Sequence, residues 1–429
     1  MAANYARSFR LVCSPEQMPL VEALLQAQGY AFEPEPFSPL CRKLTNEPRP
    51  LGSSLAASFG YIYIQDRSSM LPPLALHPPT GAAVLDMCAS PGSKTGFLAQ
   101  LVGRNGFVLA NEPSTARLGT LRANLHQMNL LQAATCSYPG EKLPLNAATW
   151  HHIQLDPPCS GWGTAQKNPL ALKLWQGDKI DNLVSLQRRL LRQAAQLLVD
   201  GGDLVYSTCT TNRTENEEQV LYAEEYLGLE RVKLEPFPGF VWETQTGGEG
   251  TLRVDGARSQ AQGFYVARLH KPEHGKKDLP MPDAPACATA AKRHRPPVAA
   301  VLPPEALCVH GCAAELPEGG QAMVFGGQVR FVPRQAALLL PEACTWQGAL
   351  LGKLVNGKLA VADRLHALMP SRPDPTQDIV LEDVGAITAL LSGQSLQTGL
   401  KGREAGLWWR DLALGRIALR QGRAVARFR

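Results

Sequence analysis

The sequence predicts an α/β fold built on a doubly wound parallel sheet, with smaller modules before and after it. Between residues 71 and 270, short apolar runs alternate with stretches of helical periodicity, as in βαβ units. The chain of 429 residues is too long for one ordinary core, so two or three domains are expected. Its composition, 45% hydrophobic and 19% charged, is that of a globular protein.

The first predicted module spans residues 1–70. A helix is expected over Pro15–Gln28, because Ser14 can cap its start and Gly29 can end it. A proline-rich stretch follows, from Glu33 to Pro50, and then the strand-like run FGYIYIQ.

The central module, residues 71–270, holds the alternating pattern. Its buried parallel strands are expected at residues 83–85, 106–110, 152–155 and 203–206. The helices between them are expected at residues 118–128 and 182–199. A Rossmann-like sheet of this kind places its ligands beyond the carboxyl ends of its strands.

The composition changes again after residue 270. Residues 271–298 are rich in Lys, His, Pro and Ala and are interpreted as a linker. Residues 299–429 contain strand-like runs such as QAMVFGGQVRFV and ALLLP. The last 29 residues hold eight Lys/Arg against two acids, a charge of +6 that suits a phosphate-rich partner or a solvated face. Within them, Trp408 and Trp409 either stack on bases or fill a core.

A candidate cofactor loop lies in AAVLDMCASPGSKTGFLAQL, a strand, a tight Gly/Pro turn and a helix. Such a turn points backbone N–H groups at a ligand, and Gly92 permits close approach. Glu112 follows Asp86 by 26 residues and can accept hydrogen bonds from ribose hydroxyls. The match to a phosphate-binding P-loop is partial, and the dinucleotide fingerprint is absent. A purely structural turn is the remaining alternative.

Two cysteines follow predicted strands. Cys159 lies in HIQLDPPCSG and Cys209 in GGDLVYSTCTT. Because parallel strands end at the same edge of a sheet, the two thiols are expected to face one crevice. A lone buried cysteine is more often a small hydrophobic residue, but two at strand ends, one beside Asp-Pro-Pro, favour chemistry.

Methylation of cytosine at carbon 5 is a reaction that needs such thiols. A thiolate that adds to carbon 6 makes carbon 5 nucleophilic, and a base must later remove the carbon 5 proton. Hydrogen bonding at N3 assists the addition, and Asp156 is the candidate for it. Lys94 is expected to supply positive charge that lowers the pKa of the attacking thiol.

The motifs DMCASPGSKT, NEPSTAR, LDPPCSG and STCT, with YIQDRSSMLP upstream, resemble the signatures of RNA cytosine-5 methyltransferases. Within that family the chain is most similar to the F type of bacterial small-subunit ribosomal RNA methyltransferases. The resemblance implies a class I methyltransferase domain, S-adenosylmethionine as cofactor and structured RNA, small-subunit ribosomal RNA or the assembled 30S subunit, as partner. The order of the C-terminal segments, including LVNGKLAVADRLHALMP, implies an RNA-binding PUA-like module of β-barrel type.

The resemblance also implies roles for residues. The cofactor would be bound by Cys88, Ala89, Ser90, Pro91, Gly92, Ser93, Lys94, Glu112, Arg117 and Asp156. Cys209 would be the nucleophile, Cys159 would assist product release, and Asp156 and Lys94 would complete the catalytic set. In the loop where the family has an acidic residue on the adenine side, this chain has Pro139, with Glu141 two positions later.

Alternatives to this function stay open at the level of sequence. Asp-Pro-Pro followed by an aromatic residue marks amino-group methyltransferases, but Cys159 stands at that position here. A non-catalytic RNA-binding or ribosome assembly factor with the same fold is the second alternative, favoured by Pro139. Arg117 and Arg122 either contact phosphate or cofactor or cover an exposed helix face. Cys308, His310, Cys312 and Cys344 form only a weak zinc pattern, so no metal is expected.

The expected cellular location depends mainly on features that the sequence lacks. No run of about 18 apolar residues suggests a membrane span, and the N-terminus lacks the apolar core of a secretory signal. Ten scattered cysteines favour a reducing cytoplasm. We also expect a monomer.

Overall fold

The computed structural model describes residues 7–165, 178–244, 248–273, 300–309, 312–313 and 316–427. Its centre is a nine-stranded sheet in the order β10-β12-β9-β8-β5-β6-β7-β18, with β11 paired to β12. The strands from β9 to β7 are parallel, and β12, β10 and β18 are antiparallel to their neighbours. The bounds of the strands are β5 Ala83–Asp86, β6 Phe107–Asn111, β7 Ala133–Cys136, β8 Trp150–Leu155, β9 Leu198–Thr208, β10 Glu230–Val232, β11 Leu252–Val254, β12 Phe264–His270 and β18 Trp346–Gln347.

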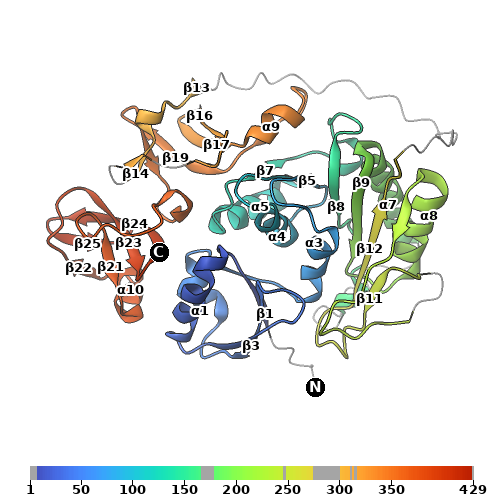
Figure 1. Cartoon of the computed structure of the whole chain (residues 1–429), viewed down its shortest axis with the longest axis horizontal. Coiled ribbons are helices and arrows are strands. Elements are labelled where there is room, and N and C mark those ends of the chain that lie inside the picture. Colours follow the sequence, from blue (N-terminus) through green and yellow to red (C-terminus); the bar gives the residue numbers. More distant parts are fainter. Residues whose placement is uncertain are drawn as a thin grey trace.

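Helices cover both faces of this sheet, so the predicted doubly wound α/β fold is confirmed (Figure 1). The helices are α3 Leu71–Leu76, α4 Ser93–Val102, α5 Thr115–Gln127, α7 Asp178–Leu197 and α8 Glu217–Leu227. The central strands β5, β6 and β7 are buried along nearly their whole length because both faces of the sheet are covered there. The reversal of strand order lies between β5 and β8, and both strands end at the crevice expected to hold a ligand.

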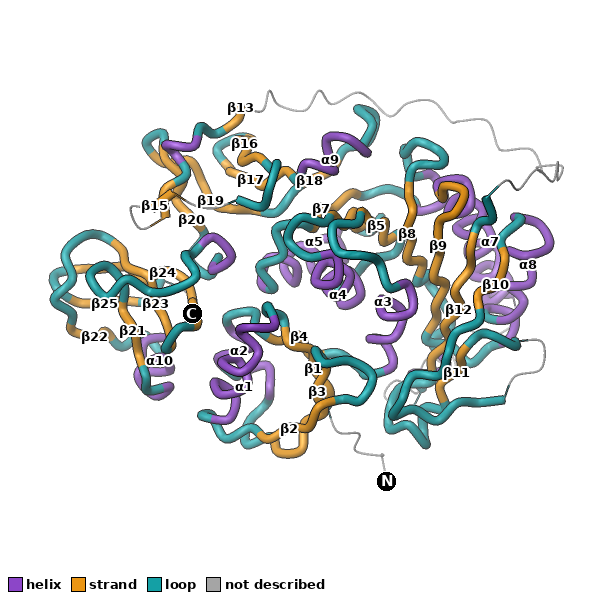
Figure 2. The backbone as a smooth tube through the Cα atoms, in the orientation of Figure 1, coloured by secondary structure: helices purple, strands orange, loops and turns teal. Residues whose placement is uncertain are grey.

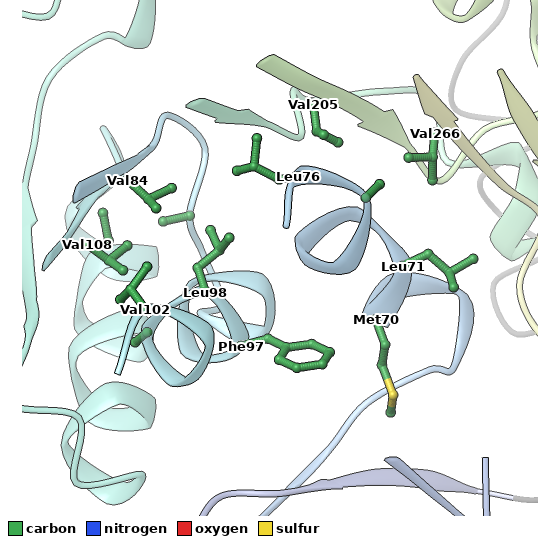
Figure 3. Packing of buried hydrophobic residues seen from close by; sticks show 14 of the residues in the cluster. Met70, Leu71, Leu76, Val84, Phe97, Leu98, Val102, Val108, Val205 and Val266 are labelled. Atoms are coloured by element: carbon green, nitrogen blue, oxygen red, sulfur yellow. The ribbon is translucent and has the colours of Figure 1, made fainter. Parts of the chain in front are cut away.

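The core on the α3 and α4 side shows how these helices fix the sheet. Figure 3 shows Val84 of β5, Val108 of β6, Val205 of β9 and Val266 of β12 on the sheet, facing Leu76 and Leu98 of the two helices. All of these side chains are buried. This packing holds the start of α4, and the loop that precedes it, at the carboxyl end of β5.

The N-terminal module is a four-stranded antiparallel sheet, β2-β3-β1-β4, with two helices. Its elements are β1 Ser8–Leu11, α1 Met18–Gln26, β2 Ala31–Pro34, β3 Cys41–Asn46, α2 Leu55–Ser58 and β4 Ile62–Ile64. The predicted helix after Ser14 is confirmed, although its first turn, Pro15–Gln17, is a 3-10 turn. Strand β3 and the end of β2 lie within the stretch that the sequence analysis described only as proline-rich.

The C-terminal region holds two sheets and a separate hairpin (Figure 2). The first sheet has the order β13-β16-β17-β19-β20 and the second β21-β23-β24-β25-β22. The bounds are β13 Ala300–Val301, β14 Cys308–Val309, β15 Cys312–Ala313, β16 Gln321–Phe325, β17 Gln328–Val332, α9 Arg334–Leu339, β19 Leu350–Val355, β20 Lys358–Val361, β21 Ile379–Leu381, α10 Val384–Leu391, β22 Ser395–Gln397, β23 Glu404–Trp409, β24 Leu412–Arg420 and β25 Arg423–Val425. The strand-like run QAMVFGGQVRFV forms β16 and β17, which pair antiparallel as a hairpin.

One element prediction is wrong, and one predicted helix is present with different ends. The run ALLLP lies mostly in the short helix α9 instead of a strand. The helix expected at residues 182–199 begins at Asp178 and ends at Leu197, because Leu198 already starts β9. In both places a short continuous apolar run carries no periodicity that separates helix from strand.

The second C-terminal sheet packs against the N-terminal module. One buried cluster joins Phe9, Leu24 and Tyr61 with Leu407 and Trp409, and the Tyr61 hydroxyl donates a hydrogen bond to the carbonyl of Ala413. The two segments lie side by side in Figures 1 and 2. Trp408 and Trp409 are each 1% exposed, which supports core filling over base stacking.

The basic tail is partly neutralised within this sheet. Arg416 and Arg427 pair with Glu404, and Arg410 pairs with Glu382. The predicted linker lies almost entirely outside the described residues, as does Arg429. Among the helices that the structure describes, none is both long and apolar enough for a bilayer.

Candidate functional site

The loop that follows β5 forms one wall of the crevice. The amide of Ala89 donates to the carbonyl of Asn111 at 2.9 Å, which ties the loop to the end of β6. Gly92 has a φ of +105°, and a Cβ there would lie 3.0 Å from Leu121 Cδ1. Ser93 then starts α4. Glycine thus provides both the left-handed conformation and the space that the turn needs.

Glu112 lies beside this loop, as the sequence predicts. Its carboxylate is buried, accepts a hydrogen bond from the amide of Ser114 at 2.8 Å and lies 3.3 Å from Arg117 Nη1. Arg117 also donates from Nη2 to the carbonyl of Ser90 at 3.1 Å. Arg117 therefore connects the acidic residue and the loop, and its side chain is 57% exposed.

Asn111 is a site residue that the sequence analysis missed. Its amide nitrogen donates to the carbonyls of Met87 and Tyr138 at 3.1 and 3.0 Å, and its amide oxygen accepts from the Tyr138 N–H at 3.0 Å. These bonds join the loops after β5, β6 and β7. A polar residue just before Glu112, at a strand end, was the only signal available.

The loop after β7 contains Pro139 and Glu141. Pro139 is exposed and precedes a 3-10 turn, Gly140–Lys142, in which Glu141 is half-buried. Gly140 is buried, and a Cβ there would lie 2.6 Å from Leu190 Cδ2. Position 139 holds no acidic residue. We therefore predict that backbone groups, apolar contacts and Glu141 line the adenine side of the crevice.

Lys94 and Asp156 form an ion pair across the crevice. Lys94 Nζ lies 2.7 Å from Asp156 Oδ2, and Ser207 Oγ donates to Asp156 Oδ1 at 3.0 Å. Burial lowers the pKa of Lys94, but the attraction of Asp156 outweighs it and the net pKa is raised. Lys94 is therefore a fixed cation, 5.3 Å from the centre of the Phe264 ring.

The two motif cysteines meet at the carboxyl ends of β8 and β9. Their Sγ atoms lie 3.4 Å apart, and both are free thiols. The amide of Gly163 donates to the carbonyl of Cys209 at 3.0 Å, which holds the loop after Cys159 against the end of β9. The expectation that the thiols face one crevice agrees with this geometry.

The surroundings make the two thiols different. The pKa of Cys209 is lowered by the hydrogen bond from Cys159 and by the charge of Lys94, against burial and Asp156. The pKa of Cys159 is raised well above its ordinary value by the same hydrogen bond, by burial and by Asp156. Of the two thiols, Cys209 therefore has the lower pKa and loses its proton more readily.

Glu215 fixes both cysteine loops and was not predicted. It is fully buried and accepts hydrogen bonds from the Ser160 N–H at 2.9 Å, from Ser160 Oγ, from Gln187 Nε2 at 3.0 Å and from Asn212 Nδ2 at 3.3 Å. Ser160 Oγ also lies 2.7 Å from Thr210 Oγ1. A buried carboxylate thus holds the residues next to Cys159 and Cys209 together.

The cysteines of the weak zinc pattern do not meet in one described cluster. Cys344 is hydrogen-bonded to Cys136 at the end of β7. Cys308 and Cys312 belong to the hairpin of β14 and β15, and His310 lies outside the described residues. Within the described ranges, no group of three or more His, Cys, Asp or Glu residues is placed to hold a metal.

Known proteins resemble this chain in the region that contains the site. Residues 73–270 fit the family model described as 16S rRNA methyltransferase RsmB/F. The Ribosomal RNA small subunit methyltransferase F of Shewanella amazonensis is 38% identical over 259 residues, which cover 58% of this chain and 55% of that protein. The protein of the same name in Cronobacter sakazakii is 38% identical over 259 residues, covering 57% and 52%. The chain spans about half the length of these relatives.

Solved structures share the fold. The methyltransferase homolog protein from Pyrococcus horikoshii superposes with a TM-score of 0.54 and 32% identity, covering 62% of this chain and 87% of that chain. NSun6 from Pyrococcus horikoshii with SFG has a TM-score of 0.54 at 21% identity, covers 63% and 91%, and shares the fold. S-adenosylmethionine is the cofactor of this family. With the methyltransferase region matched in both sequence and fold, residues 73–270 of this chain form a methyltransferase domain of the RsmB/F family.

Proposed function

We propose that this chain methylates carbon 5 of cytosine in ribosomal RNA, with Cys209 as the nucleophile. The observation that carries the proposal is the pair of thiols 3.4 Å apart, at the ends of adjacent strands and beside the Lys94–Asp156 ion pair. An amino-group methyltransferase has no use for either thiol. The position of Cys159, directly after Asp-Pro-Pro, is where such enzymes need an aromatic residue.

The crevice suits S-adenosylmethionine. The turn at Gly92 brings backbone amides close to a ligand, since a Cβ there would press on Leu121. Residues Cys88–Lys94 would contact the methionine part of the cofactor, and Asp156 would lie near its methyl group. The buried carboxylate of Glu112, held in place by Arg117, would accept hydrogen bonds from the ribose. When bound, S-adenosylmethionine supplies the methyl group that carbon 5 takes up, and leaves as S-adenosylhomocysteine.

Cys209 performs the covalent step in this proposal. Its thiolate adds to carbon 6 of cytosine, a sulfur–carbon bond forms, and the electrons of the 5,6 double bond become available at carbon 5. After methylation a base removes the carbon 5 proton, the double bond returns, and the sulfur–carbon bond breaks to release the thiolate. The charge of Lys94 and the hydrogen bond from Cys159 both favour the thiolate form.

Asp156 and Cys159 have supporting roles. Asp156, oriented by Lys94 and Ser207, is proposed to hydrogen-bond at N3 and stabilise the adduct. Cys159 holds its proton, because its pKa is raised, and lies in contact with the sulfur that must leave. We therefore assign it to product release.

The proposed substrate is small-subunit ribosomal RNA, as naked RNA or in the assembled 30S subunit. Support comes from the family model and from the names of the relatives. The N-terminal module and the C-terminal region, with its basic last segment and a proposed PUA-like module, would grip the RNA electrostatically while a flipped cytosine enters the crevice. We propose a monomer that acts in the cytoplasm.

The test is methyl transfer from labelled S-adenosylmethionine to small subunits from cells that lack this gene, followed by nucleoside analysis. The expected product is 5-methylcytidine, lost in Cys209→Ala while cofactor binding persists. Cys159→Ala is expected to accumulate a covalent protein–RNA adduct. An adduct in Cys209→Ala but none in Cys159→Ala would reverse the two roles. No transfer and no cofactor binding would favour the assembly-factor function and point to Pro139.

A further inference from the structure

A second cavity lies away from the cysteine site, where the methyltransferase sheet meets the first C-terminal sheet. Its volume is about 210 Å³. Helix α5 and strand β7 form one wall, and the segment from β17 to β19 forms the other. The proposed mechanism uses none of its lining residues.

The cavity carries three basic side chains, Arg122, His126 and Arg330, and all three are half-buried. Arg122 Nε donates to Thr135 Oγ1 at 2.9 Å, and Arg330 Nη1 donates to the carbonyl of Gly348 at 2.9 Å. Both contacts are to neutral oxygens. The guanidinium groups are therefore positioned by the protein without being neutralised by it.

No carboxylate occurs among the described residues that line the cavity. Burial lowers the pKa of Arg330, and the charge of Arg122 lowers it further. Burial likewise lowers the pKa of His126, and the charge of Arg330 adds to the effect. The positive charges of Arg122 and Arg330 therefore repel each other in this partly buried site, and a bound anion would relieve the repulsion.

The remaining lining is apolar and includes Leu130, Leu350 and Leu365. The volume is below the range of about 300–1,000 Å³ that takes a drug-sized ligand, so one small group fits. Exposed Ala123 and Gln347 lie at the rim, which leaves the arginines within reach of solvent. Paired guanidinium groups above an apolar floor match a phosphate joined to a nucleoside.

We propose that this cavity binds the phosphate of one RNA nucleotide that lies outside the target site. The inference rests on the proposed function, in that RNA is the substrate. Arg122 is five residues from Arg117 on α5, about 7.5 Å along the helix axis, so one helix carries cations at the cofactor crevice and at the cavity. Such a phosphate contact positions the RNA without reading its sequence.

The test measures binding of a fluorescein-labelled fragment of small-subunit ribosomal RNA over a series of salt concentrations. Arg122→Gln/Arg330→Gln is expected to weaken binding about tenfold and to reduce the salt slope by about 0.7 for one lost single-strand phosphate contact. Because Arg330 also supports the backbone of Gly348, Ala123→Glu is the second variant. It adds a carboxylate at the rim on an exposed helix position and leaves the packing intact. Ser185→Glu, exposed on α7, is the matched control and should bind RNA as wild type does.

Equal binding by wild type and both cavity variants, or an equal loss in Ser185→Glu, would overturn the inference. Phosphorus NMR with inorganic phosphate and cytidine monophosphate tests the other source of a phosphate. If those probes bind through Arg122 and Arg330 while RNA binding is unchanged, the RNA assignment is wrong. Methyl transfer is measured in parallel. Cavity-dependent RNA binding without transfer would contradict the proposed function alone.

Discussion

The sulfur atoms of Cys159 and Cys209 lie 3.4 Å apart, although 50 residues separate the two cysteines in sequence. Parallel strands β8 and β9 bring them together by ending side by side. The surroundings lower the pKa of Cys209 and raise the pKa of Cys159, so we expect the two thiols to differ in nucleophilicity. This asymmetry is directly measurable.

Alkylation of Cys209 should reveal a lowered pKa. In wild type, its reaction with iodoacetamide should reach half-maximal rate below the pH of an ordinary thiol, whose pKa is about 8.5. Cys159→Ala removes the S–H donor and Lys94→Gln removes the positive charge, so each should move the profile of Cys209 to higher pH. Mass spectrometry of labelled peptides gives the rates. Burial raises the pKa of Cys13 to about 12, which makes it the unreactive reference. If Cys159 reached its half-maximal rate at a lower pH than Cys209, the predicted order of the two pKa values would be wrong.

Glu215 should act as a positioning residue. In Glu215→Gln the new NH2 group would face a donor in either orientation. At the Oε1 position it would meet the Ser160 N–H and the Gln187 amide, and at the Oε2 position the Asn212 amide. A donor–donor contact would thus replace a buried hydrogen bond to the carboxylate. Such a bond is worth about 1.5–3 kcal/mol, so kcat should fall about 10- to 100-fold. The Kd for S-adenosylmethionine should be unchanged, and the alkylation profile of Cys209 should shift. Glu218→Gln is the control, because the Glu218 side chain in the first turn of α8 is 42% exposed. Normal thiol reactivity in Glu215→Gln would leave Glu215 with no positioning role.

The sequence predicted those parts of the site that depend on local pattern. A strand that ends in Asp-Pro-Pro-Cys, or in Ser-Thr-Cys, places its cysteine at a sheet edge wherever the sheet is parallel. The sequence analysis did not predict Glu215 as a site residue, because an acidic residue just before a helix is usually exposed to solvent. Its burial follows only from contacts with Ser160 and Gln187, 55 and 28 residues away.

Long-range packing explains the remaining differences in the fold. Hydrophobic periodicity marks Trp409 as apolar but cannot say that it meets Phe9 and Leu24 in one cluster. The pairing of β18 with β7 likewise joins residues about 210 positions apart, through only two residue pairs. Pairings this short leave no detectable pattern in either segment.

The buried carboxyl of Asp86 should make stability depend on pH. Burial raises its pKa to about 6, partly offset by the hydrogen bond from Thr95. Between about pH 4 and pH 6, Asp86 therefore holds a proton in the folded state but has lost it in the unfolded state, whose pKa is near 3.9. The stabilisation is complete below pH 4 and is lost as pH rises through 6. It amounts to about 3 kcal/mol.

Asp86→Asn tests this because asparagine does not titrate. The difference in free energy of unfolding between wild type and Asp86→Asn, measured with urea at a series of pH values, should fall by about 2 kcal/mol between pH 4 and 7. Using the difference removes the contributions of the other carboxylates. A difference that is constant with pH would mean that Asp86 has an ordinary pKa.

The core shared by the N-terminal module and the last sheet should make them unfold together. Trp409→Ala deletes a side chain that is 1% exposed, which costs about 3–5 kcal/mol. Hydrogen exchange should then accelerate in β1 and β4 as well as in β23 and β24, while β5 and β6 keep their protection. Leu351→Ala is the contrasting variant, because Leu351 is equally buried but belongs to the first C-terminal sheet. It should loosen that sheet without exposing β1. If Trp409→Ala left β1 and β4 fully protected, the two modules would be independent, and their contact would contribute little to the stability of either.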